Sequence, residues 1–261
     1  MKITLRMIIL AISITVLTAT PLTLHATDAY TTQESTRPTG RRRNLPPEPP
    51  PAGVDPTRPM IALTFDDGPG RHTAQILDVL EAHNSRATFF VMGDSITYFY
   101  ETIERMHENG FEVAGHSWNH PELTLLTNEE IRHHIIGPHD RIESVIGPTT
   151  QIFRAPFGAT NDRVLRVARE AGFALIGWSV DPRDWELRDA REVTRNVLQY
   201  SRDGSIVVLH DIHMTTAQSM ERAVPKLVER GYQLVTVSEL FYYRGIALNP
   251  GQIHRSAPPR N

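Results

Sequence analysis

Met60-Ile61-Ala62-Leu63-Thr64-Phe65-Asp66-Asp67-Gly68-Pro69 is the stretch of sequence that decides the fold. The apolar run at its start has the length and the branched and aromatic side chains of a buried strand, and the closing Gly-Pro pair turns the chain. Asp66 and Asp67 are therefore adjacent carboxylates at the end of a strand, where they would repel each other unless a cation lies beside them. The stretch predicts a metal ion at one of these carboxylates, and a solvated Asp-Gly turn is the alternative.

Apolar runs alternate with amphipathic stretches along the chain that follows. We expect strands at residues 60–65, 87–92, 111–115, 152–154, 173–180, 205–209 and 233–237, and helices at residues 76–80, 96–106, 128–146, 162–171, 190–200 and 224–230. This alternation predicts an α/β fold in which a parallel sheet curls into a distorted (β/α) barrel with a single catalytic domain.

Polar residues follow the carboxyl ends of the expected strands. They are Asp66, Asp67, His116, Arg154, Asp181 and His210. In a β/α barrel these ends meet on one face, where active sites are built. We therefore expect these side chains to converge.

Two imidazoles lie four residues apart in His116-Ser117-Trp118-Asn119-His120, just after the expected strand 111–115. A tight turn can bring both to one ion, and with Asp67 they would form a set that leaves a position open for water. The chain contains no cysteine, so histidine and carboxylate are the ligands available to a bound metal. Two exposed loop histidines are the alternative.

Three further segments place candidate groups at strand ends. Arg154 can hold a carboxylate through two hydrogen bonds. Asp181 adds an acid, and Trp185 follows it as an aromatic wall. His210 ends a wholly apolar run. Taken singly, three of these residues have ordinary explanations. Arg154 could form a surface ion pair, Trp185 could be a core or rim aromatic, and His210 could be a half-buried histidine.

Five motifs in this order resemble the polysaccharide deacetylase family, whose catalytic unit is the NodB homology domain of carbohydrate esterase family 4. The motifs are the T-F-D-D-G-P turn at 64–69, the H-S-x-x-H turn at 116–120, the R-x-P-x-G segment at 154–158, the D-x-x-D-W segment at 181–185 and the histidine at 210. The match extends from Arg58 to Tyr243, and these motifs rarely occur together by chance. The resemblance implies a distorted barrel of the NodB type.

The resemblance also implies how a metal site and a base would be built. Asp67, His116 and His120 would hold a divalent metal, usually zinc, with Co²⁺, Ni²⁺ or Mn²⁺ as alternatives. Asp66 would be the general base that takes a proton from water, and Arg154 would keep it ionised and oriented.

A second group of residues would serve the leaving group and the acetyl pocket. By the same resemblance, His210 would protonate the departing amine, and Asp181 would pair with it and raise its pKa. The backbone N–H of Phe157 would stabilise the oxyanion, while Trp185 and Val208 would wall the pocket for the acetyl methyl group. Phe157 stands where many members have tyrosine, and Val208 where many have leucine.

The function implied is metal-dependent hydrolysis that removes N-acetyl groups from N-acetylglucosamine units and releases acetate. The polymer would be peptidoglycan, a chitin-like oligomer or an exopolysaccharide, and peptidoglycan is our first expectation. An esterase that removes O-acetyl groups from a xylan-type polymer is one alternative. A carbohydrate-binding module without turnover is the other, although Asp66 and His210 are both present.

The ends of the chain differ in composition from the expected barrel. We expect a signal peptide at residues 1–26, which could also remain as an uncleaved anchor, and a proline-rich linker at residues 27–58. The catalytic domain would occupy residues 59–244, and residues 245–261 would form a flexible tail. The protein would then be exported to the periplasm, cell envelope or exterior.

Charge and the remaining polar residues limit the partners. The formal net charge is −3 and there is no long basic run, so we expect no nucleic-acid partner, contact with a membrane only through the N-terminal segment, and a monomer. We expect only supporting positions for Asp94, Asp184, Asp211 and His213, and solvated positions for His133, His134 and His139.

Overall fold

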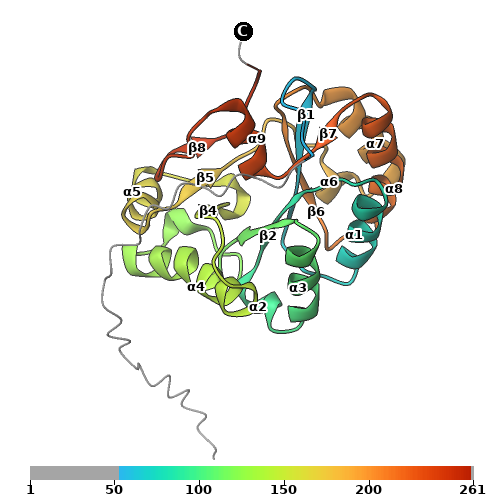
Figure 1. The fold of residues 1–261 in the computed structure, drawn as a ribbon. Coiled ribbons are helices and arrows are strands. Elements are labelled where there is room, and N and C mark those ends of the chain that lie inside the picture. The colour runs from blue at the N-terminus through green and yellow to red at the C-terminus, as the bar shows by residue number, and fades with distance from the viewer. Residues whose placement is uncertain (1–52, 260–261) are drawn as a thin grey trace, which may run out of the picture. The chain divides into compact units, whose positions relative to one another are not determined.

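A parallel sheet forms the centre of the computed structural model, which describes residues 53–259 (Figure 1). The strands are β1 (Met60–Asp66), β2 (Thr88–Val91), β3 (Glu112–Gly115), β4 (Ile152–Phe153), β5 (Ala174–Ile176), β6 (Ile206–His210), β7 (Gln233–Leu234) and β8 (Ile253–His254). Their order is β6-β1-β2-β3-β4-β5-β8, and β7 pairs with the start of β1. An isolated parallel bridge between Val180 and Val207 links the chain after β5 to β6, so the sheet curls into the expected distorted barrel.

Helices connect the strands and cover the outside of the sheet (Figure 1). They are α1 (Thr73–Ala82), α2 (Gly93–Ile96), α3 (Tyr100–Glu108), α4 (Asn128–Ile146), α5 (Asp162–Ala171), α6 (Asp184–Leu187), α7 (Ala190–Tyr200), α8 (Met214–Glu229) and α9 (Val237–Arg244). The sequence predicts α4, α5 and α7 with the bounds observed. The expected helix 96–106 is instead two helices, because a turn separates α2 from α3.

Side-chain caps explain why several helices begin where they do. Thr127 accepts a hydrogen bond from the backbone N–H of Glu130, whose side chain in turn accepts from the N–H of Thr127, which is a complete capping box for α4. The side chains of Asn161 and Asp189 cap α5 and α7 by accepting hydrogen bonds from backbone N–H groups in the first turn of each helix. These signals are local in sequence, so the helix starts can be predicted without the fold.

The inner side of the barrel is filled with apolar side chains at the end opposite the strands' carboxyl ends. Met60, Ala62 and Ile206 from the sheet form one buried cluster with Phe241 of α9. The backbone N–H of Val237, the first residue of α9, donates to Thr88 Oγ1 at the start of β2 (2.8 Å). α9 therefore closes this end of the barrel and leaves the carboxyl ends of the strands for polar groups.

The expectation of a flexible tail at residues 245–261 is wrong for the part that the structure describes. β8 adds to the free edge of β5, and Ser256 forms an antiparallel bridge with Ser205 beside β6. Ala257 is fully buried, and its N–H donates to the carbonyl of Gly204 (2.9 Å). The proline-rich composition suggests a solvated end, but an unpaired edge of β5 supplies hydrogen-bonding partners that only the fold reveals. The expected signal segment 1–26 and residues 27–52 of the expected linker 27–58 lie outside the described residues.

We expect Gly204→Ala to destabilise the barrel by disturbing this closure. Gly204 has φ +82°, and a Cβ built there would lie 2.2 Å from the carbonyl oxygen of Ala257. Gly231 is the matched control, because it has φ +87° but nothing within 4 Å of such a Cβ. Thermal unfolding should show a loss of about 1 kcal/mol for Gly231→Ala and about 2 to 4 kcal/mol for Gly204→Ala. Equal losses would mean that the packing of Ala257 contributes nothing.

Candidate active site

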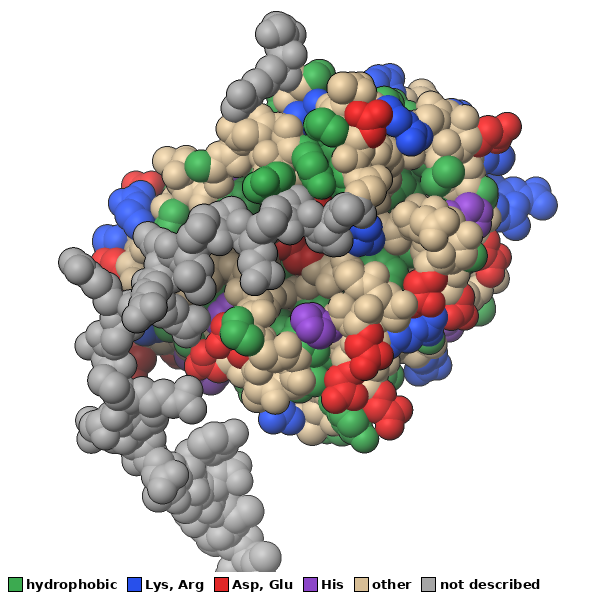
Figure 2. Space-filling model, in the orientation of Figure 1, with side chains coloured by type: hydrophobic (Ala, Val, Ile, Leu, Met, Phe, Trp, Pro, Cys, Tyr) green, Lys and Arg blue, Asp and Glu red, His purple; other side chains and the backbone are tan. Residues whose placement is uncertain are grey.

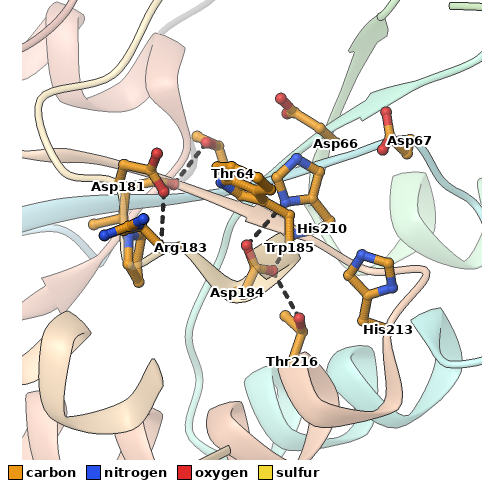
Figure 3. Close-up of polar contacts among 12 residues, drawn as sticks. Thr64, Asp66, Asp67, Asp181, Arg183, Asp184, Trp185, His210, His213 and Thr216 are labelled. Atoms are coloured by element: carbon orange, nitrogen blue, oxygen red, sulfur yellow. Dashed lines mark hydrogen bonds and ion pairs between the residues drawn. The ribbon is translucent and has the colours of Figure 1, made fainter. Parts of the chain in front are cut away.

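The carboxyl ends of β1, β3, β4 and β6 bring five of the six expected residues together. Asp66 is the last residue of β1 and is paired in register with His210 at the end of β6. His116 follows β3 and Arg154 follows β4. Figure 3 shows Asp66, Asp67 and His210 side by side. The expected convergence therefore holds for these residues, and Asp181 is the exception described below.

Asp67, His116 and His120 form a cluster whose ligand atoms all lie within 4.8 Å of one another. The Nε2 atoms of His116 and His120 lie 3.4 and 3.3 Å from Asp67 Oδ1. Asp67 and His120 have φ angles of 71° and 63°, which are uncommon for residues other than glycine. The turns after β1 and β3 thus hold unusual backbone conformations that bring these side chains to one point.

The state of these three side chains fits a divalent cation. Asp67 Oδ1 is buried and has no hydrogen-bond partner among the described residues. His116 Nδ1 donates to the carbonyl oxygen of Arg154 (2.9 Å), which orients the ring with Nε2 toward Asp67. A buried, unsatisfied carboxylate oxygen beside two imidazole nitrogens is the donor set that zinc and similar ions prefer.

The pKa values of the cluster favour the forms that bind metals. Burial raises the pKa of Asp67, but contact with His116 and the charges of the neighbouring imidazoles outweigh this and lower it to about 2. Burial, together with the charge of His116, lowers the pKa of His120 below its ordinary value. At neutral pH the carboxylate is therefore ionised and the imidazole of His120 is neutral.

Asp66 and Arg154 form a buried ion pair next to this cluster. Both are almost fully buried, and Arg154 Nη1 lies 2.7 Å from Asp66 Oδ1. The guanidinium also donates to Thr64 Oγ1 (2.7 Å) and to the carbonyl oxygens of Ile176 and Gly177 (both 3.1 Å). These bonds fix the guanidinium, which in turn fixes Asp66. Asp66 Oδ2 faces the cluster, 3.9 Å from His116 Nε2.

His210 is paired with Asp184, so the expectation that Asp181 pairs with it is wrong. His210 Nδ1 lies 2.9 Å from Asp184 Oδ1, and the backbone N–H of His210 donates to Asp184 Oδ2 (2.7 Å). Thr216 Oγ1 donates to the same oxygen (2.7 Å). Asp181 is exposed and accepts from the N–H of Arg183, and Figure 3 shows it away from the imidazole.

Local geometry explains why Asp184, and not Asp181, reaches His210. Arg183 has φ +60°, and the chain turns there into α6, whose first residue is the fully buried Asp184. Burial lowers the pKa of His210, but the hydrogen bond and charge of Asp184 outweigh this and raise it to about 9. The imidazole therefore carries a proton at neutral pH.

Two residues support the site from outside the cluster, of which the sequence predicts a supporting position for Asp211 and a solvated one for His134. Asp211 is fully buried under the turn after β1, where a Cβ on Gly68 would lie 2.2 Å from its carboxylate oxygens. His134 Nδ1 accepts a hydrogen bond from the backbone N–H of Trp118 (3.2 Å) and so steadies the loop that carries the two histidines. The polar sequence of α4 predicts that its histidines are solvated. Only the packing of the loop 116–120 on the helix identifies the contact between His134 and Trp118.

Three residues, Phe157, Trp185 and Val208, are expected to form the pocket for the acetyl group. Phe157 has φ 59°, and its exposed ring packs edge-on against His120 with centroids 4.5 Å apart. Its backbone N–H has no hydrogen-bond partner among the described residues. Trp185 is half exposed, and Val208 is buried and paired in register with Thr64. Their contact with a substrate stays a prediction.

Comparison with known proteins agrees with this geometry. The family model for polysaccharide deacetylase matches residues 53–176. The chain is 43% identical over 188 residues to the peptidoglycan-N-acetylmuramic acid deacetylase PdaC of Bacillus subtilis, covering 72% of this chain and 40% of that one. It is 33% identical over 186 residues to a peptidoglycan-N-acetylglucosamine deacetylase of Bacillus cereus, covering 69% of this chain and 68% of that one.

A solved structure shares the same fold. It is a family 4 acetyl xylan esterase from Clostridium thermocellum in complex with a cobalt ion, with a TM-score of 0.72 and 31% identity over 76% of this chain and 99% of that one. The chain spans only about two-fifths of the length of PdaC, whereas it spans two-thirds of the B. cereus relative. From the matched segment, the shared fold and the cluster at its strand ends, we conclude that the chain belongs to the polysaccharide deacetylase family.

Proposed function

We propose that this protein hydrolyses N-acetyl groups on the N-acetylglucosamine units of a polysaccharide and releases acetate. One observation carries the proposal: Asp66 and His210 lie beside the Asp67, His116 and His120 cluster, each held by a buried partner of opposite charge. A positioned base and a positioned acid next to a metal-type cluster are the groups that amide hydrolysis requires.

A divalent metal would be held by Asp67, His116 and His120. We propose zinc, and cobalt is supported by the solved relative that binds it. When bound, the ion would polarise the acetyl carbonyl and lower the pKa of a water molecule. The buried Oδ1 of Asp67, which has no hydrogen-bond partner among the described residues, and the Nε2 of His116 that faces it are the features of this chain that support the site.

Asp66 takes the proton from the attacking water. Arg154 binds one of its carboxylate oxygens and leaves the other turned toward the cluster. The unpaired backbone N–H of Phe157 is a donor for the oxyanion that forms as the carbonyl is attacked. Trp185 and Val208 then limit the space open to the acetyl methyl group.

His210 gives its proton to the nitrogen of the departing sugar amine. Asp184 holds the imidazole through Nδ1, so Nε2 is the atom from which the proton leaves. The raised pKa of about 9 keeps that proton available at neutral pH. In this proposal Asp184 replaces Asp181 as the positioning carboxylate.

We expect Asp184→Asn to move the alkaline limb of the pH–rate profile to lower pH. A general acid works below its pKa, so activity with wild-type His210 should fall as the pH rises through about 9. Without the Asp184 charge, burial lowers the pKa of His210 and is opposed only by the smaller contributions of the Asp66 and Asp67 charges, so this pKa should fall well below 9. The limb should then lie closer to neutrality, and kcat measured at about pH 8 to 9 should drop by about tenfold or more relative to the wild type.

Asp181→Asn is the matched control for this experiment, because Asp181 is exposed and does not contact His210. Its pH profile should overlay that of the wild type. A shift in the Asp181 variant, with none in the Asp184 variant, would reverse the assignment.

Peptidoglycan is the polymer that we propose as the substrate. The named relatives in B. subtilis and B. cereus are peptidoglycan deacetylases, and the N-terminal segment has the composition of an export signal. In the described part of the chain no helix has the length and apolarity needed to cross a membrane. We accordingly propose an exported protein that acts in the cell envelope as a monomer, with a catalytic domain that begins at about residue 59 and extends beyond the expected end at 244 to include β8.

An O-acetyl esterase is the second candidate, and the likeness to the acetyl xylan esterase supports it. Acetate release should be measured on purified peptidoglycan, chitin oligomers and acetylated xylan, each with and without a chelator. The proposal requires chelator-sensitive release from an N-acetylated polymer. Release from xylan alone would establish the esterase, and binding without release from any polymer would indicate a carbohydrate-binding module.

A further inference from the structure

A groove lined with basic side chains runs between α7 and α8, on the outside of the barrel. These two helices lie side by side at one edge of the molecule, where Figure 2 shows lysine and arginine side chains projecting (Figure 1, Figure 2). The groove has a volume of about 400 Å³ and is lined by Arg191, Thr194, Arg195, Leu198, Gln199, Arg222, Lys226 and Arg230. Five of these eight residues are cationic, and all five are exposed.

The charge of this groove is largely unpaired. Within the described part of the chain, Arg195 alone among the five lies within 4 Å of a carboxylate, that of Glu192 (3.0 Å), and the charges of Arg191 and Arg195 also act on Asp189. Arg230 donates to the carbonyl oxygen of Leu198 (2.7 Å), which satisfies a donor but not its charge. Because the whole chain has a formal net charge of −3, this concentration of positive charge is a local feature. Its self-repulsion would be relieved by an anionic ligand.

The spacing of the cations indicates the shape of that ligand. Arg191 and Arg195 are four residues apart on α7, and the same spacing separates Arg222 and Lys226 on α8 and Arg230, which directly follows α8. Four residues of helix rise about 6 Å, so each wall offers positive charges about 6 Å apart over a length of up to about 12 Å. Two such rows suit a linear chain with regularly spaced negative charges better than a single small anion.

The chemistry of the lining indicates which polyanion fits. Four of the five cations are arginines, whose planar guanidinium groups match phosphate oxygens through paired hydrogen bonds. No aromatic side chain lines the groove, so bases have no surface on which to stack. The concave shape favours a polymer chain over the flat surface of a membrane. We propose that this groove binds a linear phosphodiester polymer without nucleobases, such as a poly(glycerol phosphate), whose backbone lies between α7 and α8.

This inference is independent of the deacetylase proposal, because the groove shares no residue with the cluster at the strand ends. Binding should be measured with the full chain and a fluorescent synthetic poly(glycerol phosphate), using anisotropy at two salt concentrations. With about four unpaired cations engaged, affinity should fall about 50-fold between about 50 and 200 mM salt. A salt-independent affinity would overturn the proposal.

Neutral substitutions at exposed positions test the groove itself. Arg222→Gln with Lys226→Gln should weaken binding at low salt by about tenfold or more and halve the dependence on salt. Arg191→Gln with Arg195→Gln on the opposite wall should do the same. Melting temperatures and any acetate release should match the wild type, since none of these side chains is buried or lies in the proposed active site.

The matched control removes two exposed arginines from α5 by Arg163→Gln with Arg166→Gln. It makes the same change in net charge outside the groove and should bind as the wild type does. Equal weakening in control and groove variants would overturn the proposal. Tighter binding to anionic vesicles, or to a single-stranded oligonucleotide of equal charge, would also overturn it, by identifying a membrane or a nucleic acid as the partner.

Discussion

Asp66→Asn is expected to lower kcat/KM for deacetylation by about a thousandfold, with metal content close to that of the wild type. Asparagine keeps the size of the side chain but cannot accept a proton from water, and general bases contribute about 10² to 10⁴ to rate. Asp66 lies beside the cluster but is absent from its ligand set, so the ion should remain. Metal analysis and steady-state kinetics on the same protein sample test both parts.

The buried ion pair makes the choice of asparagine important. Arg154 is fully buried, and removing its partner altogether would leave a charge unpaired in the core. Asparagine can still accept the hydrogen bond from Arg154 Nη1, and Thr64 and two carbonyl oxygens still bind the guanidinium. We therefore expect a loss of at most about 3 kcal/mol for asparagine and more for alanine.

Thermal unfolding separates this structural effect from the catalytic one. An asparagine variant that is folded, loaded with metal and inactive supports the assigned base. If that variant turned over substrate as fast as the wild type, another group would have to take the proton, and the role of Asp66 would be abandoned.

The sequence predicts the parts of this fold whose causes are local. The capping residue Thr127 and the periodicity of α4 define that helix, and the buried run at residues 60–65 defines β1. The turn motifs at Asp67 and His116 follow directly from the ends of their strands. Because parallel strands bring these ends together, the metal-type cluster can be predicted before any distance is known.

Features that depend on packing between distant segments cannot be predicted in this way. Asp181 and Asp184 are both acids near one motif, and the chain's turn at Arg183 decides which of them is buried against His210. The role of residues 253–257 depends on the free edge of β5, about 80 residues earlier in the chain. The groove between α7 and α8 joins two rows of cations that look like ordinary solvated helix faces when each helix is considered alone.

His116→Ala is expected to lower metal content and turnover together, in contrast to the change at Asp66. His116 contributes Nε2 to the cluster and is held by the carbonyl oxygen of Arg154, so its loss removes a ligand and leaves a buried acceptor unsatisfied. Changes in the shell outside the ligands already cost 10- to 100-fold in metal affinity, so loss of a ligand should cost at least about a hundredfold. Metal content, measured after gel filtration, reports the loss of the ligand. The rate of acetate release reports the loss of turnover.

Chelation provides the same test without a substitution. Treatment of the wild type should abolish acetate release, and added zinc or cobalt should restore it, whereas the Asp66→Asn protein should stay inactive in every metal. His107→Ala removes an exposed histidine of α3 and should leave metal content and activity unchanged. Full activity in metal-free wild-type protein would show that the cluster of Asp67, His116 and His120 has no part in the reaction, and the proposed roles of Asp66 and His210 beside it would then lose their basis.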